Sequence, residues 1–132
     1  MKINNKLETL INLFEGNEIR SIWDVEKENY YFSIVDVIVV LTNANIPRNY
    51  WSYLKRHLIA EGSKPHGKIV RLKMKAKDGN FRETDTLDTE EIFRLIESVP
   101  SPKAEPFKMW LAGSRKERID EVFDLEIAGF FM

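Results

Sequence analysis

Basic side chains concentrated in one stretch of the chain are the clearest chemical signal in this sequence. From Arg48 to Arg82 there are ten lysines and arginines and only two acidic residues, so this stretch carries a net charge of +8 while the rest carries −9. Such segregation predicts a basic face on an acidic body, and basic faces bind polyanions such as nucleic acid. The simpler alternative is a solvated face that binds nothing. The candidate DNA-binding residues are Arg48, Asn49, Lys55, Arg56, Lys64, Lys68, Arg71, Lys73, Lys75, Lys77 and Arg82.

The alternating part of this stretch predicts a β-hairpin, whose register decides what its basic face can do. The dipeptide Asp78-Gly79 is a strong turn signal between a strand over Lys68–Lys77 and a returning strand over Phe81–Leu87. With a two-residue turn, Lys75 opposes Arg82. Like charges directly opposite each other are destabilising, so this register indicates that a polyanion sits there.

A three-residue loop with Gly79 in a left-handed conformation gives the other register. Lys73 then opposes Glu83 and Arg71 opposes Asp85, which makes a solvated, salt-bridged face that needs no ligand. We favour this register, because it keeps both carboxylates off the apolar face of the other strand. The cations that remain free for phosphates are Lys75, Lys77 and Arg82.

A helix predicted over Pro47–Ala60 supplies the second group of candidates. Proline suits the first helical position, and apolar residues at helical spacing follow it. Arg48 and Asn49 at the helix start suit base edges by their geometry. Lys55 and Arg56 suit phosphates. The alternative is an ordinary amphipathic helix whose polar side faces water.

The segment Ser33–Leu41 has an ambiguous pattern. Its valines and isoleucines favour a strand by propensity. We predict a helix, because Ser33 and Asp36 have the spacing of a capping box, in which the serine hydroxyl accepts from the Asp36 amide and the carboxylate reaches back. Followed by the helix from Pro47, it makes a helix-turn-helix-like pair.

The rest of the chain predicts further short elements. An amphipathic helix is expected over Leu7–Phe14, with Gly16 as its stop, and a hairpin over Ile19–Phe32. Three more helices are expected from Asp88 to Pro100, from Ser101 to Gly113 with an irregular turn at Pro106, and over Arg115–Phe123. The expected fold is α+β: a small antiparallel sheet or hairpins packed with about five short helices, including the helix-turn-helix-like pair.

Catalytic and metal-binding chemistry has little support in the sequence. There is no cysteine, which excludes thiolate nucleophiles, thiolate metal sites and disulfides. His57 and His66 lack a partner at ligand spacing. An acidic cluster, which helix capping explains and for which a nuclease metal site is the alternative, consists of Asp85, Asp88, Glu90 and Glu91. We expect a protein that is not an enzyme and uses no metal or cofactor.

Composition indicates one globular domain over residues 1–132. Hydrophobic residues make up 43% and charged residues 31%, a balance typical of folded chains. The longest apolar run, around Val37–Leu41, is far shorter than the ~20 residues of a membrane span. The N-terminus has no signal-peptide core. We expect a cytoplasmic protein with no membrane partner.

Four blocks of the sequence match a known pattern when they are taken together. Tyr31–Val37 is followed by Trp51–Arg56, and Leu87–Ile96 runs into Ser101–Leu111, whose Ser-Pro-Lys-Ala-Glu-Pro-Phe-Lys run is the most specific part. Over a core of about Ile19–Ala128, the chain resembles the Bro-N domain. This is the N-terminal domain of baculovirus repeated-ORF proteins, phage antirepressors and DNA-damage-inducible protein D.

The resemblance implies a small α+β fold that binds double-stranded DNA. It also implies a phage- or prophage-derived regulator, antirepressor-like, acting in the bacterial cytoplasm. The alternative is a protein-interaction module that grips a repressor and never touches DNA. Salt dependence separates the two, because phosphate contacts weaken steeply with added salt and an apolar interface does not. The oligomeric state stays open.

Overall fold

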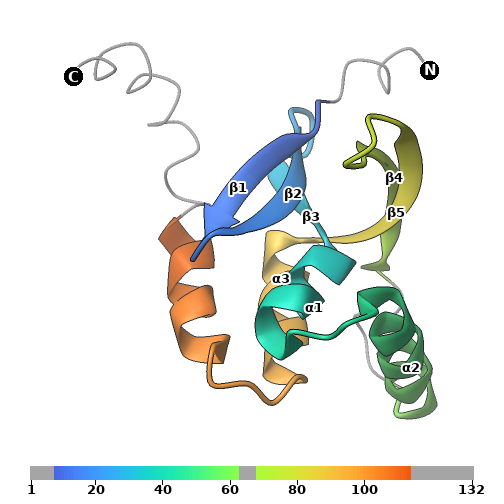
Figure 1. The fold of residues 1–132 in the computed structure, drawn as a ribbon, viewed down its shortest axis with the longest axis vertical. Helices are drawn as coiled ribbons and strands as arrows, with labels where there is room; N and C mark the ends of the chain where they lie inside the picture. Colours follow the sequence, from blue (N-terminus) through green and yellow to red (C-terminus); the bar gives the residue numbers. More distant parts are fainter. Residues whose placement is uncertain (1–7, 63–67, 114–132) are drawn as a thin grey trace.

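The computed structural model describes residues 8–62 and 68–113 (Figure 1). The strands are β1 (Leu10–Phe14), β2 (Asn17–Asp24), β3 (Asn29–Ser33), β4 (Val70–Lys75) and β5 (Phe81–Asp88). The helices are α1 (Ile34–Thr42), α2 (Pro47–Ala60), α3 (Thr89–Glu97) and a further helix over residues 104–113. Outside the described residues lie Lys64, His66 and the helix predicted over Arg115–Phe123.

The predicted arrangement of hairpins with about five short helices is wrong, although the class is α+β. The described residues form one five-stranded sheet in the order β1-β2-β3-β5-β4, together with four helices. All neighbouring strands are antiparallel. The two halves of the sheet meet where Phe32 of β3 pairs with Leu87 of β5. This pairing joins segments far apart in the chain, and local sequence patterns carry no information on it.

The helix predicted over Leu7–Phe14 is also wrong, because its last five residues form strand β1. Apolar residues at positions 10, 11, 13 and 14 fit a helical period, but pairing with β2 makes this segment a strand. Glu15 and Gly16 both have positive φ, at 51° and 83°. Two consecutive left-handed residues make the turn that suits a tight hairpin, so Gly16 turns the chain into β2 instead of ending a helix.

The prediction of a helix after Ser33 is confirmed. The Ser33 hydroxyl accepts a hydrogen bond from the Asp36 amide at 3.3 Å, as expected of the N-cap residue. The second half of the predicted capping box is absent, since the Asp36 carboxylate accepts instead from Arg20 on β2. Asn43 ends α1 in the left-handed conformation, with φ of 58°.

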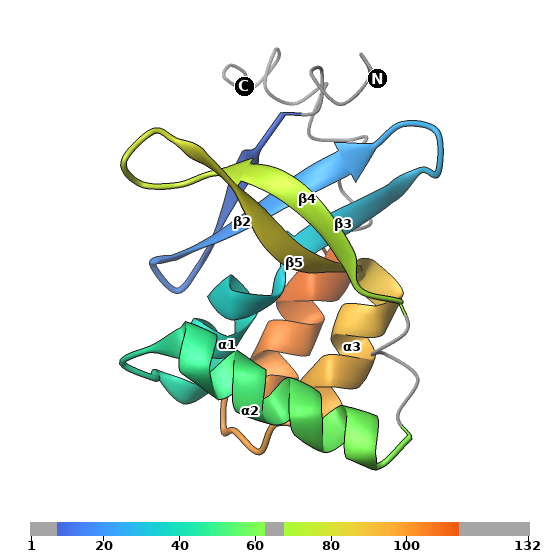
Figure 2. The ribbon, with the colours of Figure 1, turned by 90° about the vertical axis from the view of Figure 1, so that its right-hand side faces the viewer.

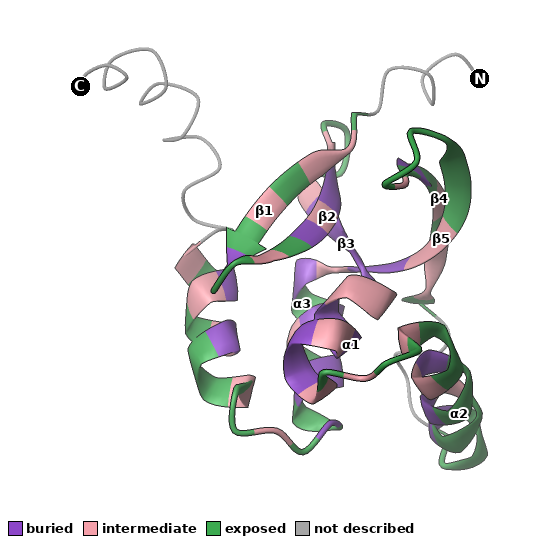
Figure 3. Cartoon of the chain, in the orientation of Figure 1, coloured by how far each residue is buried: buried purple, intermediate pink, exposed green. Residues whose placement is uncertain are grey.

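The helices cover one face of the sheet and form the main core with it. Ile19, Phe32 and Leu87 are completely buried on that face, among residues of α1, α3 and the helix over residues 104–113. Helix α2 packs against α1 and buries Trp51 and the leucines of its inner side, while its outer side is exposed (Figure 3). No helix in the described part of the chain has the length and apolarity required to cross a membrane.

The sheet curls, so that its last strand returns to its first (Figure 2). The Lys75 amide at the end of β4 donates to the Thr9 hydroxyl at 3.1 Å, just before β1. The Lys75 carbonyl accepts from Arg20 Nη1 at 3.3 Å. Ile22 and Met74 are buried on the face turned away from the helices, where the curl encloses them.

Candidate nucleic-acid interface

The β4–β5 hairpin has the register that was favoured from the sequence. Arg71 pairs with Asp85 and Lys73 with Glu83. The connection is the predicted three-residue loop, with Gly79 at φ of 89°. Across this loop the Ala76 amide donates to the Asn80 carbonyl at 2.8 Å. The basic residues of β4 therefore share a face with Asp85.

Asp85 connects the hairpin to α2. Its Oδ2 accepts from Trp51 Nε1 at 2.9 Å and from Lys55 Nζ at 3.1 Å, and its Oδ1 accepts from Arg71 Nε at 3.2 Å. Lys55 Nζ also lies 5.5 Å from the centre of the Trp51 ring. Burial by itself raises the pKa of Asp85, but hydrogen bonds from Trp51, Lys55 and Arg71 outweigh burial and hold this pKa below its usual value.

This junction places a basic residue of α2, Lys55, beside a basic residue of the hairpin, Arg71. Arg48 precedes Lys55 by two helical turns and so lies on the same flank of α2. On β4, Lys73 and Lys75 continue the row that starts at Arg71, because alternate residues share a face. Figure 2 shows α2 and the β4–β5 hairpin on the side that faces the viewer. We call this side the α2–hairpin face; its members are Arg48, Lys55, Arg71, Lys73, Lys75 and Lys77.

Most basic side chains of the described residues are neutralised by a carboxylate of the same chain. The exceptions, with no described carboxylate within ion-pair distance, are Lys27, Arg48, Arg56, Lys73, Lys75 and Lys77. All of these except Lys27, which lies in the β2–β3 turn, belong to α2 or to the β4–β5 hairpin. The unpaired cations of the described residues are therefore carried mainly by α2 and the hairpin, and Lys75 and Lys77 lie toward the hairpin tip.

Several predicted site residues lie away from this row. Arg82 pairs with Met74 across the strands and so starts from the opposite face of the hairpin, where its guanidinium forms an ion pair with Asp78. Lys68 Nζ lies 3.4 Å from Oε2 of Glu91, a buried residue of α3. Asn49 and Arg56 share the outward side of α2, and both are exposed.

Phe81 also lies on this face, although it is not among the site residues predicted from the sequence. It pairs with Lys75 across the hairpin, and its side chain is 57% exposed. An apolar ring next to free cations suits contact with sugars or bases as well as with phosphates. The favoured register already placed Phe81 opposite Lys75, so this signal was present in the sequence.

The acidic residues near this face do not assemble into a metal site. Asp88 caps α3 by accepting from the Glu91 amide at 2.9 Å, as predicted. Asp85 is occupied by Trp51 and by two basic side chains. Among residues 8–62 and 68–113, no three His, Cys, Asp or Glu side chains are grouped so that they could hold a metal ion. His57 lies at the surface, 3.0 Å from Glu61.

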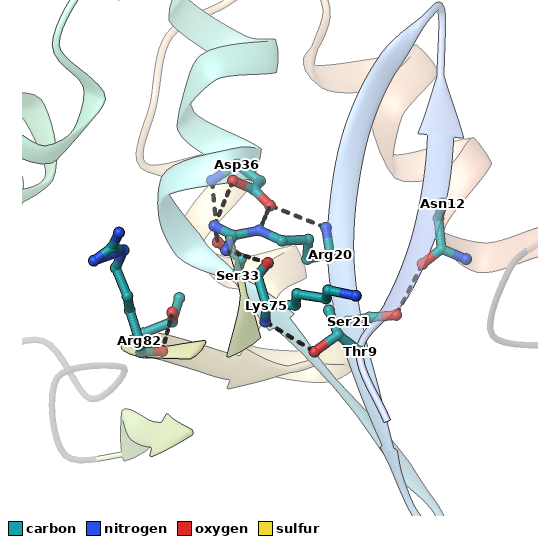
Figure 4. Close-up of polar contacts among 9 residues, drawn as sticks. Thr9, Asn12, Arg20, Ser21, Ser33, Asp36, Lys75 and Arg82 are labelled. Carbon is teal, nitrogen blue, oxygen red and sulfur yellow. Dashed lines mark hydrogen bonds and ion pairs between the residues drawn. The ribbon is translucent and has the colours of Figure 1, made fainter. Parts of the chain in front are cut away.

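A cavity of about 900 Å³ adjoins the tip of the hairpin. It is lined by Lys75 and Lys77, by the β1–β2 turn and by Asp36 and Val39 of α1. Arg20 also lines it, and Figure 4 shows the contacts of Arg20 with Asp36. Arg20 Nε and Nη2 bind the two Asp36 oxygens at 2.7 and 3.0 Å, and Nη2 also donates to Ser33. Arg20 Nη1 donates to the Lys75 carbonyl, so this arginine of β2 connects β2 with α1 and β4.

A comparison with known protein families matches residues 18–123 to the BRO family, N-terminal domain. Comparisons with curated proteins and with solved structures found no match. The matched region includes all of α1, α2 and the β4–β5 hairpin, and it confirms the resemblance seen in the sequence. The chain therefore belongs to the BRO family and carries its N-terminal domain.

Proposed function

We propose that this domain is a DNA-binding regulatory module of the phage or prophage type, antirepressor-like, and that duplex DNA binds to the α2–hairpin face. The observation that carries the proposal is the placement of unpaired cations: all but one of those in the described residues lie on α2 or the hairpin. Family membership supports a regulatory role of this kind. Such a regulator acts in the cytoplasm, where its DNA is.

The two elements have different tasks in this proposal. Lys73, Lys75 and Lys77 neutralise phosphates, which fixes the position of the duplex but does not read its sequence. The start of α2 carries Arg48 on this face and Asn49 on the adjoining outward side of the helix, and both side chains suit base edges in the major groove. The first turn of α2 has no acidic residue and no side-chain cap. Pro47 has no amide hydrogen and the Asn49 and Tyr50 amides donate to the Ile46 carbonyl, which leaves the Arg48 amide, without a partner among the described residues, for a phosphate.

The test is a titration of labelled duplex DNA at several salt concentrations. Each neutralised phosphate contributes about 0.9 to the slope of log affinity against log salt. Engagement of the row of cations therefore predicts a slope of roughly 3–5 for a random duplex. Absence of binding to any duplex at low salt, or affinity that does not change with salt, contradicts DNA binding.

A protein partner is the second candidate, because the same side of the domain also exposes apolar groups. Phe81 is 57% exposed and Ile59 of α2 is 45% exposed. Aromatic and aliphatic side chains of this kind anchor protein interfaces. Under this alternative the domain holds a repressor, and the complex persists at salt concentrations that release DNA.

We further propose that binding involves no catalysis by this domain. Asp85 and Asp88 have structural partners, in the α2 junction and in the α3 cap. Plasmid DNA should remain intact after incubation with the protein and magnesium or manganese. Cleavage that disappears when Asp85 or Asp88 is replaced overturns this proposal.

A further inference from the structure

Among the described residues, strand β1 is an edge of the sheet that lacks the usual protective residues. Its sequence, Leu10-Ile11-Asn12-Leu13-Phe14, contains no charged residue and no proline. Edge strands in soluble proteins normally carry such residues, because an open edge pairs with other chains. The other edge, β4, follows this rule: it carries Arg71, Lys73 and Lys75, and its end is covered by Thr9. The β4 edge therefore carries charged residues, whereas the β1 edge is uncharged.

The free backbone groups of β1 can be identified from its pairing with β2. The turn at Glu15 and Gly16 has two residues, so Phe14 and Asn17 form a hydrogen-bonded pair. Hydrogen-bonded and non-hydrogen-bonded pairs alternate along the ladder. The amides and carbonyls of Ile11 and Leu13 consequently point away from β2, and no hydrogen bond to them is found within the described residues.

The side chains at these same positions are exposed. Ile11 is 57% exposed and Leu13 is 62% exposed, and both lie on the face that carries Arg20, where Ile11 also lines the cavity beside α1. Asn12, between them, points to the other face and accepts from the Ser21 hydroxyl at 2.8 Å (Figure 4). Within the part of the chain that the structure describes, unpaired backbone groups and exposed apolar side chains thus coincide on one short strand.

We propose that β1 is a dimerisation edge, and that its partner is β1 of a second copy of this chain, antiparallel about a two-fold axis at Asn12. Ile11 and Leu13 lie symmetrically about Asn12, so the register that places Ile11 opposite Leu13 of the other copy joins every free amide to a free carbonyl. A two-fold interface requires such self-complementarity, and this strand has it.

The side chains and charges also fit this register. The exposed isoleucine and leucine of one copy pack on the leucine and isoleucine of the other, which removes both from water. At the ends of the pair, Thr9 lies opposite Glu15 of the second copy, so no like charges meet. The contact is small, so the dimer forms in a concentration-dependent equilibrium with the monomer. The inference does not depend on DNA binding.

The register gives a sharp test, because the chain has no cysteine of its own. In the proposed pair, Asn12 faces Asn12 of the second copy in a non-hydrogen-bonded position, where Cα atoms lie about 4.5 Å apart, within disulfide range. Asn12→Cys should form a disulfide-linked dimer under mild oxidation. Leu13→Cys is the matched control: the two copies of position 13 are diagonal, about 7–8 Å apart, so it should cross-link much less.

The mass in solution tests the same contact without oxidation. Wild-type protein should show an average mass that rises with concentration in sedimentation equilibrium, whereas Leu13→Lys should remain a monomer, because it places two like charges beside the axis. Ile59→Lys adds the same charge to an exposed position of α2 and should dimerise as the wild type does. A wild type that stays monomeric at all concentrations, or equal cross-linking of Asn12→Cys and Leu13→Cys, overturns the proposal.

Discussion

Trp51 of α2 donates its indole N–H to the carboxylate of Asp85 on β5 at 2.9 Å, and this bond sets how the helix sits against the hairpin. Both groups have limited freedom, because the Trp51 ring is buried in the core and Asp85 belongs to a paired strand. The same carboxylate also holds Lys55 and Arg71, one from each element. This carboxylate therefore fixes the position of Lys55 on α2 relative to Arg71 on the hairpin.

Asp85→Asn should have opposite effects on stability and on DNA affinity. The free energy of unfolding should fall by about 1–3 kcal/mol, because charge-assisted hydrogen bonds from Lys55 and Arg71 are weakened. Affinity for DNA should rise and the salt slope should steepen, since both cations become available to phosphates. Urea denaturation and salt-dependent binding measure the two effects.

A matched control for this variant is Asp24→Asn. It removes the same charge at the β2–β3 turn, where Asp24 accepts from the Glu26 and Lys27 amides, away from the α2–hairpin face. It should change DNA affinity much less than Asp85→Asn does. An equal gain in both variants would mean that net charge alone, and not the cations beside Asp85, controls binding.

The contribution of the ionised Asp85 carboxylate to stability should also be visible in the pH dependence of the free energy of unfolding. Its pKa in the folded state is held below the usual value, so its stabilising contribution is present above the unfolded pKa of about 4 and is lost as pH falls through the lower, folded pKa. The stability difference between wild type and Asp85→Asn should therefore be full at neutral pH and shrink in acid. Urea denaturation at a series of pH values down to about 3 measures this difference.

Much of the local structure follows from the sequence. Ser33 caps α1 although the helix is rich in β-branched residues, because one hydroxyl placed three residues before the Asp36 amide selects the helix start. The hairpin register follows from Gly79 and from keeping carboxylates off the apolar face of β4. These features depend on neighbouring residues or on a single turn, which is why patterns of spacing predict them.

What could not be predicted depends on contacts between distant segments. Strand β1 exists because it pairs with β2 through a turn in which Glu15, a non-glycine residue, adopts positive φ. The sheet is continuous because β3 pairs with β5. The sequence places Arg71 opposite Asp85, but only the fold brings Trp51 and Lys55 to the same carboxylate. The row of free cations emerges only when these partners are known.

Arg20 should contribute more to the free energy of unfolding than any exposed basic residue does. Its guanidinium binds both Asp36 oxygens, the Ser33 hydroxyl and the Lys75 carbonyl, and the pair is mostly buried. Arg20→Met should lower the free energy of unfolding by about 2–3 kcal/mol, since it leaves the mostly buried Asp36 carboxylate with fewer partners. Arg94→Met, which breaks an exposed pair with Glu90, should cost no more than about 0.5 kcal/mol. Thermal and urea denaturation compare the two.

Lys75→Gln and Lys77→Gln should weaken binding to every duplex by a similar factor. Phosphate contacts carry no sequence information, so the loss should be the same for random and preferred DNA, and each variant should lower the salt slope by about 0.9. Lys27→Gln is the matched control, because Lys27 is also unpaired among the described residues but lies in the β2–β3 turn. If all three variants lose the same affinity, the hairpin is not the binding surface.

Arg48→Ala and Asn49→Ala should reduce discrimination between DNA sequences more than they reduce general affinity. Both residues are exposed in the first turn of α2, and arginine and asparagine form bidentate bonds with guanine and adenine edges. Once selection from a random pool has supplied a preferred sequence, each variant should lose about 1–3 kcal/mol on it and much less on random DNA. Ser52→Ala, an exposed polar position one turn further along the same helix, should leave both affinities unchanged. Uniform losses would make α2 a phosphate-binding element only, and selection that returns no preferred sequence would contradict base recognition by α2.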